Sequence, residues 1–162
     1  MNRHPKIIQA GVLDALSGKG AHAATKNLFE GLDWKLAGMR PKGAPHSIFQ
    51  ILGHMIFWQD WVAVWVDGKN PPVPKHAAES WPRDPAPASE QDWTRAVKAF
   101  GRSLRGLERR SRKGNLLELR GKETRLGMLH HVASHNSHHA GQVVALRQIL
   151  GAWPPPSGGV TW

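Results

Sequence analysis

The chain has 162 residues, the size of one domain, and its 22 Lys and Arg against 12 Asp and Glu give a formal charge of +10. The sequence contains no cysteine, which excludes disulfides, thiolate metal ligands and a cysteine nucleophile. No apolar run approaches the roughly 18 residues that a membrane-spanning helix needs, and the N-terminus lacks an apolar segment of signal-peptide length. We therefore expect a single domain over residues 1–162, no membrane association, and a cytoplasmic location.

Apolar residues at helical spacing predict two helices in the first quarter of the chain. The first is a short N-terminal helix over 6–16, which ends at a pair of nearby glycines. The second covers 22–37, where Leu28, Leu32 and Leu36 recur every four residues.

A tryptophan-rich helix follows over 47–66, with Ser47 as its N-cap residue. One face carries a stripe at steps of three and four residues, which consists of Ile51, His54, Trp58, Trp61 and Trp65. His54 therefore shares a face with three tryptophans and is expected to point inward. The tryptophans are most simply core residues, and part of their wall could line an apolar substrate chamber.

The segment 68–88 holds six prolines in 21 residues, too many for regular secondary structure. Antiparallel neighbours in a bundle need only about 2–8 connecting residues, whereas a link of this length can run back along a helix of ~30 Å. The length therefore favours parallel helices joined by a crossover, although the segment could also be an insertion loop.

A capping-box variant at Ser89 opens an amphipathic helix that ends near residue 112. Its apolar stripe consists of Trp93, Val97, Phe100, Leu104 and Leu107, and its cationic stripe of Arg95, Lys98, Arg102, Arg105, Arg109 and Arg112. A solvated charged face is the usual interpretation, but six cations without interleaved carboxylates leave an anionic partner open. No helix-turn-helix or zinc-finger pattern accompanies the stripe, so we do not expect a nucleic acid partner.

The last predicted helix, over 124–151, carries two histidines inside an apolar stripe of Met128, Val132, His135, His139, Val143, Leu146 and Leu150. Residues i and i+4 lie above one another on a helix, so both imidazoles point the same way. An unsatisfied buried polar group costs roughly 1–3 kcal/mol, and each imidazole therefore needs a partner. A metal ion could satisfy both, and so could ordinary hydrogen bonds in the core.

A third histidine strengthens the metal hypothesis, because packing the two stripes together would bring His54 to His135 and His139. Three histidines in a bundle interior leave positions for water or substrate, which is typical of an open catalytic site. His131 lies one turn before His135 and could replace or support a ligand, and spacing alone does not decide between them. Further candidates for supporting roles are His46 and Gln142, whereas His138 lies further to the side of the stripe.

Two motifs carry a family resemblance. They are Pro45-His46-Ser47 with Leu52-Gly53-His54 and Trp58, and His135-Asn-Ser-His-His139-Ala-Gly-Gln142 followed by Leu146-Arg147 and Gly151. In this order they resemble the DinB/YfiT-like superfamily, from about residue 28 to the end. The resemblance implies an all-α four-helix bundle, up-down-down-up with the long crossover between its second and third helices, plus the short N-terminal helix. It also implies that His54, His135 and His139 bind a divalent metal.

The same resemblance implies a function, since characterised members include metal-dependent transferases and isomerases that use low-molecular-weight thiols, and hydrolase-like activity has been assigned to others. We therefore expect a homodimeric, metal-dependent enzyme that acts on a small molecule by thiol transfer. Zinc or nickel is the expected metal, with iron and manganese as further candidates. Asp60 and Glu30 are candidate general bases without a spacing argument. The alternative is a non-enzymatic metal- or anion-binding bundle that uses the basic face of 89–112.

Overall fold

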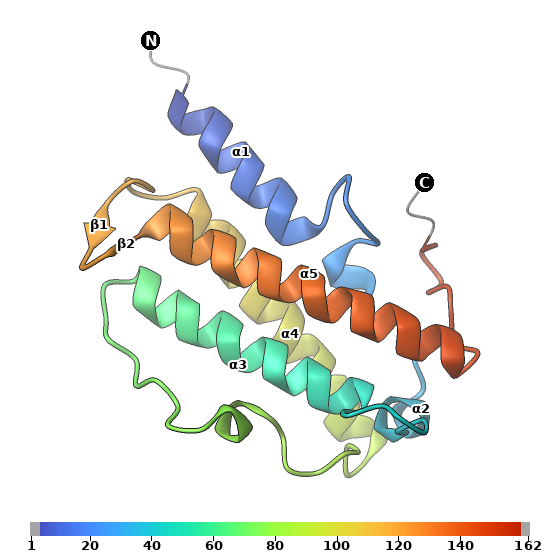
Figure 1. Ribbon diagram of the computed structural model, residues 1–162. Helices are drawn as coiled ribbons and strands as arrows, with labels where there is room; N and C mark the ends of the chain where they lie inside the picture. The colour runs from blue at the N-terminus through green and yellow to red at the C-terminus, as the bar shows by residue number, and fades with distance from the viewer. Residues whose placement is uncertain (1–3, 160–162) are drawn as a thin grey trace.

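Four long helices form the protein in the computed structural model, which describes residues 4–159 (Figure 1). They are α1 (His4–Ser17), α3 (Ile48–Val66), α4 (Glu90–Ser111) and α5 (Arg125–Ile149). Both α4 and α5 contact α1 as well as α3, so the four helices enclose one core. The predicted all-α bundle is confirmed. Within the described residues, no helix is both long enough and apolar enough to cross a membrane.

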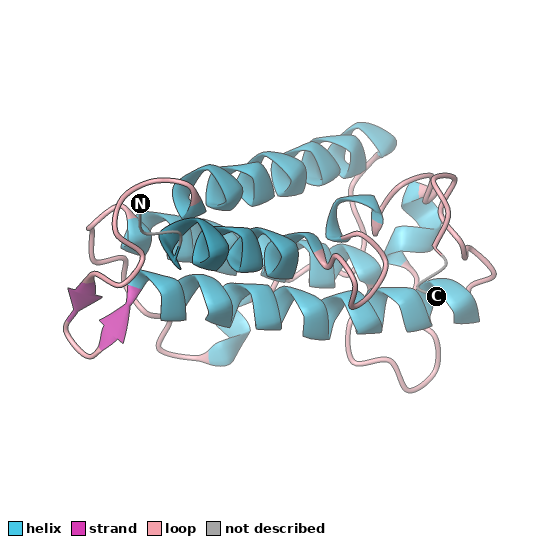
Figure 2. Cartoon of the chain, turned by 90° about the horizontal axis from the view of Figure 1, so that it is seen from above, coloured by secondary structure: helices cyan, strands magenta, loops and turns pink. Residues whose placement is uncertain are grey.

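The helices follow the predicted up-down-down-up order. In Figure 1, α3 and α4 run in one direction, and α1 and α5 run in the opposite one. The proline-rich connector between α3 and α4 returns along the length of α3 and contains one short 3₁₀ turn, η2 (Ala77–Ser80). A two-stranded antiparallel hairpin, β1 (Leu119–Arg120) and β2 (Glu123–Thr124), precedes α5 at one end of the bundle (Figure 2).

The predicted helix over 22–37 is wrong. The structure has only a 3₁₀ turn, η1 (Thr25–Asn27), and a five-residue helix, α2 (Trp34–Gly38), in this region. Gly31 adopts a φ of +64°, which a continuing right-handed helix excludes. Asp33 then starts α2 anew, because its carboxylate accepts two backbone N–H groups. The N-terminal helix α1 consequently occupies the bundle position that the sequence had assigned to 22–37.

Side-chain caps fix where the three longest helices begin. Ser47 and Gln50 form a reciprocal capping box at the start of α3, as the sequence predicted for the N-cap. Ser89 accepts the backbone N–H of Asp92 at the start of α4, and Thr124 accepts that of Gly127 at the start of α5. These caps set the phase of each helix and therefore which stripe faces the core.

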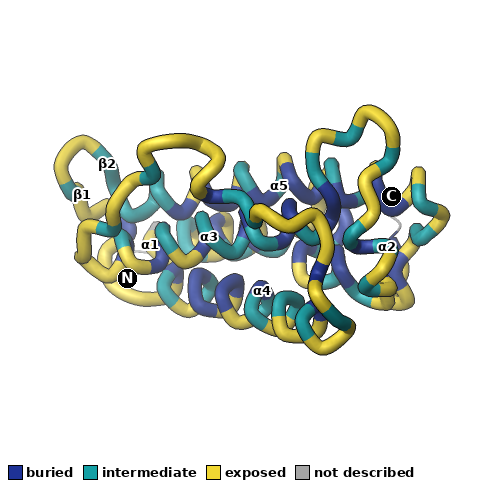
Figure 3. The backbone as a smooth tube through the Cα atoms, turned by 90° about the horizontal axis from the view of Figure 1, so that it is seen from below, coloured by how far each residue is buried: buried dark blue, intermediate teal, exposed yellow. Residues whose placement is uncertain are grey.

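Buried residues line the inner faces of the helices, and exposed residues concentrate in the loops and on the outer faces (Figure 3). The largest fully buried side chain is Arg147 near the end of α5. Its guanidinium donates to the carbonyl oxygens of Leu28 at 2.7 Å and Ala152 at 2.8 Å. The segment after α5 folds back over the bundle, with Pro156 packed against Gly31.

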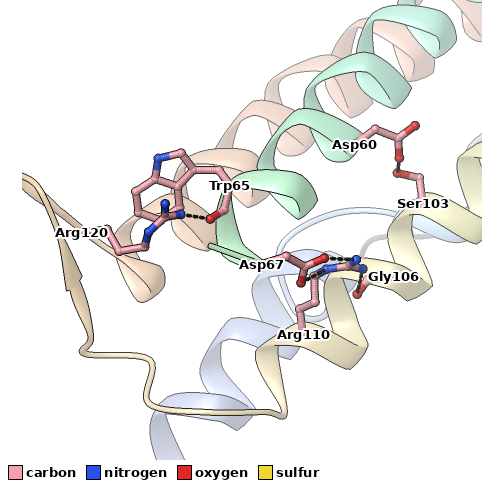
Figure 4. Close-up of polar contacts among 7 residues, drawn as sticks. All are labelled: Asp60, Trp65, Asp67, Ser103, Gly106, Arg110 and Arg120. Carbon is pink, nitrogen blue, oxygen red and sulfur yellow. Dashed lines mark hydrogen bonds and ion pairs between the residues drawn. The ribbon is translucent and has the colours of Figure 1, made fainter. Parts of the chain in front are cut away.

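Polar contacts join α3 to α4 and to the hairpin (Figure 4). Arg110 of α4 makes a bidentate pair with Asp67, with nitrogen–oxygen distances of 2.8 and 2.6 Å. Ser103 donates a hydrogen bond to Asp60, and Arg120 of the hairpin donates to the backbone carbonyl at the end of α3. The contacts of Arg110 and Ser103 hold α3 and α4 together in their parallel arrangement, and the contact of Arg120 ties the hairpin to the end of α3.

The predicted cationic stripe of α4 is exposed along its whole length, and its apolar stripe faces the core. Replacing Arg102, Arg105 and Arg109 together with glutamine should therefore change the free energy of unfolding by less than about 1 kcal/mol. Urea denaturation monitored by circular dichroism measures the change. Arg110→Gln is the matched control, because it breaks the pair with Asp67 and should cost about 1 kcal/mol. A greater loss in the triple variant would mean that the stripe is buried in an assembly.

Candidate metal centre

The structure brings the three predicted histidines together between α3 and α5. The Nε2 atom of His135 lies 3.0 Å from Nε2 of His54 and 3.1 Å from Nε2 of His139. His54 and His139 are almost fully buried, and His135 is half-buried. Because α3 and α5 are antiparallel neighbours, residues 81 positions apart in the chain can share one site.

Hydrogen bonds to the outer nitrogens orient two of the three rings. Nδ1 of His54 lies 3.2 Å from the carbonyl oxygen of Ser80, and Nδ1 of His139 lies 2.7 Å from Oε1 of Gln142. An oxygen of this kind only accepts, so each Nδ1 carries the proton and donates it. The Nε2 atoms of both rings are then left with lone pairs that point toward His135.

This arrangement fits a metal ion better than it fits hydrogen bonding among the rings. Nε2 of His135 faces two acceptor nitrogens, yet a neutral imidazole carries at most one proton there. Three nitrogen ligands at about 2.0–2.1 Å from one ion would lie roughly 3 Å apart. Nε2 of His135 lies at that spacing from both other Nε2 atoms, and the ligand nitrogens of the three residues all lie within 4.8 Å of one another. The cluster could therefore hold a metal ion, and three protein ligands would leave further coordination positions open.

Burial keeps the three imidazoles neutral. It lowers the pKa of His54 to about 4, where the charge of His139 also contributes. It lowers the pKa of His135 to about 3, assisted by the charges of His139 and His54. The pKa of His139 is lowered for the same main reason. Neutral imidazole is the form that binds a metal, so the site is ready for one at neutral pH.

The proline-rich connector forms one wall of the site, which the sequence did not predict. Trp81 stacks on His54 with ring centroids 3.8 Å apart and planes 6° apart. It also stacks on His46, at 3.7 Å and 12°. Two parallel rings this close to one indole must lie on its opposite faces, so Trp81 is sandwiched between them. A lone tryptophan among prolines was the only sequence signal for this contact.

Close packing fixes the connector against α3. An added Cβ at Gly53 would overlap the ring of Pro82, so the missing side chain lets the connector approach the helix. The amide of Gln50 donates to the carbonyl oxygen of Pro82 at 3.1 Å, and the hydroxyl of Ser47 donates to that of Pro85. These contacts place Ser80 and Trp81 beside His54.

The other histidines considered from the sequence do not join the cluster. Nδ1 of His131 lies 3.8 Å from a carboxylate oxygen of Glu123, and its side chain is largely exposed. His138 contacts the amide of Gln142, at 3.2 Å. His131 is thus no alternative ligand, whereas His46 and Gln142 support the cluster as the sequence allowed.

The two acidic residues named as candidate bases lie elsewhere. The Asp60 carboxylate accepts a hydrogen bond from Ser103 on α4, on the other side of α3 (Figure 4). Glu30 accepts the backbone N–H of Ser157. The expectation that either acts as a base at this site therefore has no geometric support.

The depressed pKa values predict that the metal-free protein loses stability in mild acid. Below about pH 6.5 the unfolded chain binds protons at all three histidines, whereas in the folded chain burial lowers the pKa of His54 to about 4 and of His135 to about 3, and also lowers that of His139. The free energy of unfolding should fall by roughly 2 kcal/mol for each of His54 and His135 between pH 7 and pH 5, which is about 4 kcal/mol for the two together. Urea titrations of chelated protein at both pH values test this. A variant with all three histidines changed to glutamine is the control, and an equal loss in that variant would contradict the assignment.

Comparison with known proteins agrees with this geometry. The chain matches the family model described as the DinB superfamily over residues 19–143, which is more than half of its length. The match includes the three clustered histidines, and it begins earlier and ends earlier than the two motifs alone suggested. No curated protein and no solved structure matches the chain significantly. The chain belongs to the DinB superfamily.

Proposed function

We propose that the protein is a metal-dependent enzyme that acts on a small molecule, of the thiol-dependent transferase type. One observation carries the proposal, which is the convergence of the Nε2 atoms of three histidines. In His54 and His139 the other ring nitrogen, Nδ1, already makes a hydrogen bond, so Nε2 is the atom left to bind an ion. His54, His135 and His139 would hold a divalent ion, with zinc or nickel as the first candidates. Such an ion lowers the pKa of a coordinated thiol or water and polarises a carbonyl group.

The chain's own residues prepare the site in three ways. The carbonyl of Ser80 and the amide of Gln142 fix the proton positions on two ligand rings. Trp81 covers one face of His54 and excludes water from it. The half-buried position of His135 leaves that side of the cluster open to solvent and therefore to a substrate.

The test is a metal-dependent conjugation assay. Protein purified without a His-tag is chelated and reloaded with zinc, nickel, iron or manganese, and then mixed with a small thiol and a fluorogenic electrophile such as a bimane. We expect reloading to restore turnover that chelation removes, and His135→Ala to abolish it. If metal-loaded protein never exceeds the uncatalysed rate with any thiol, transferase activity is contradicted.

The exposed cations of α4 support a second candidate function, which is non-enzymatic binding of an anionic partner. Among residues 4–159, the six side chains make no ion pair with a carboxylate except that Arg95 pairs with Asp92. Heparin or an oligonucleotide should then bind with an affinity that falls steeply with salt and is insensitive to chelation. Replacing three of these arginines with glutamine, at Arg102, Arg105 and Arg109, should weaken that binding and leave thiol turnover unchanged.

A further inference from the structure

An apolar pocket opens directly beside the metal centre, between α3 and α5. Its volume is about 260 Å³, and its lining consists of Trp58, Trp61, Val62, Met128, His131, Val132 and His135. His135 belongs both to this lining and to the histidine cluster. A molecule in the pocket would therefore have one end next to the open side of the cluster.

The chemistry of the lining selects the kind of molecule. Two indoles whose centroids lie 5.8 Å apart, a thioether and two valines form most of the wall. Aromatic rings and methionine sulfur pack favourably against another aromatic ring. No lysine, arginine or carboxylate lines the pocket, so it offers no partner to a charged group. An apolar cavity of about 150 Å³ suffices for a benzene ring, and this pocket has room for a ring with a substituent.

One polar side chain lies at the pocket without joining the cluster. His131 is largely exposed, and its Nδ1 faces Glu123 at 3.8 Å. The imidazole adds a hydrogen-bonding group at the pocket, one helical turn away from His135.

We propose that this pocket binds the apolar, preferably aromatic, part of the substrate, while the reacting group of that substrate lies at the histidine cluster. The inference rests on the proposed function and adds the substrate class to it. Trp58, Trp61 and Met128 are then the residues that determine specificity.

A pair of hydroxamates tests the pocket separately from the metal. Acetohydroxamate and benzohydroxamate share the same metal-chelating group and differ by the aromatic ring. On zinc-loaded protein, calorimetry should show benzohydroxamate binding about tenfold or more tighter, because burying a ring contributes roughly 1.5–3 kcal/mol. Met128→Trp, which fills the pocket, should remove this preference and retain acetohydroxamate binding. Met39→Trp is the matched control at an exposed position, and it should keep the preference.

The outcomes separate the two proposals. Equal affinity for both hydroxamates overturns the aromatic pocket and leaves the metal centre standing. If the protein takes up no metal, the proposed function fails. The pocket can still be tested on the metal-free protein, by using tryptophan fluorescence to measure the binding of benzyl alcohol. Saturable binding that Met128→Trp abolishes would support the pocket, and its absence would overturn it. Should Met128→Trp fail to fold by circular dichroism, Trp61→Ala replaces it and should also reduce the preference.

Discussion

Replacing His135 with alanine is expected to reduce bound metal from about one ion per chain to almost none. His135 is central to the cluster, because its Nε2 atom contacts the Nε2 atoms of both other histidines. Loss of a residue that only supports a ligand typically costs 10–100-fold in affinity, so loss of the ligand itself should cost more than roughly 100-fold. His54→Ala and His139→Ala should behave in the same way. Elemental analysis of protein purified without a nickel column measures the effect.

Two histidines serve as controls for this experiment. His131 lies on the same helix one turn from His135 and pairs with Glu123 instead, so His131→Ala should retain the metal. His76 is exposed in the connector, and His76→Ala should retain it as well. Full metal content in any one of the three cluster variants would remove that residue from the site. Loss of metal in His131→Ala would shift the ligand set by one helical turn.

Gly53→Ala is expected to weaken metal binding by roughly 10–100-fold although Gly53 touches no metal. The new Cβ would overlap Pro82, so the connector has to move away from α3. Ser80 and Trp81 would move with it, and His54 would lose both its hydrogen-bond acceptor and its stacking partner. Overpacking should also cost about 1–3 kcal/mol of stability. Competition with a chromophoric chelator gives the affinity, and thermal denaturation gives the stability.

The matched control for this variant is Gly141→Ala, another helical glycine close to the site. Nothing lies within 4 Å of a Cβ at that position. The change should therefore stabilise α5 by up to about 1 kcal/mol through helix propensity and leave metal affinity unchanged. Equal affinities in the two variants would mean that the connector does not position His54.

Local patterns were sufficient to predict the helices that carry the ligands. The stripes through His54 and through His135 and His139 are long and regular, and the cap at Ser47 marks where the first of them begins. Their period also indicated which side chains share a face, and the structure places those histidines together. The length of the connector favoured a crossover, because a segment of 21 residues is longer than any turn requires, and the family resemblance implied the same order.

Periodicity failed where backbone conformation outweighed it. Leu28 and Leu32 are buried as a helical stripe would require, yet Gly31 between them turns the chain and no helix connects them. The role of Trp81 was invisible for a different reason. Its contact with His54 joins an irregular segment to a helix 27 positions earlier, and no repeating pattern encodes a pairing of that kind.

The hydrogen bond between His54 and the carbonyl of Ser80 makes the connector a thermodynamic partner of the metal. A cation at Nε2 withdraws electron density from the ring and strengthens donation from Nδ1, so occupancy would draw the connector more tightly onto α3. By thermodynamic linkage, closure of the connector onto α3 must raise the affinity for the ion by the same factor by which the bound ion favours closure. Any molecule that presses the connector onto α3 raises the affinity for the ion, and any molecule that lifts it away releases the ion. The segment that joins two parallel helices would thereby also set how firmly the three histidines hold an ion.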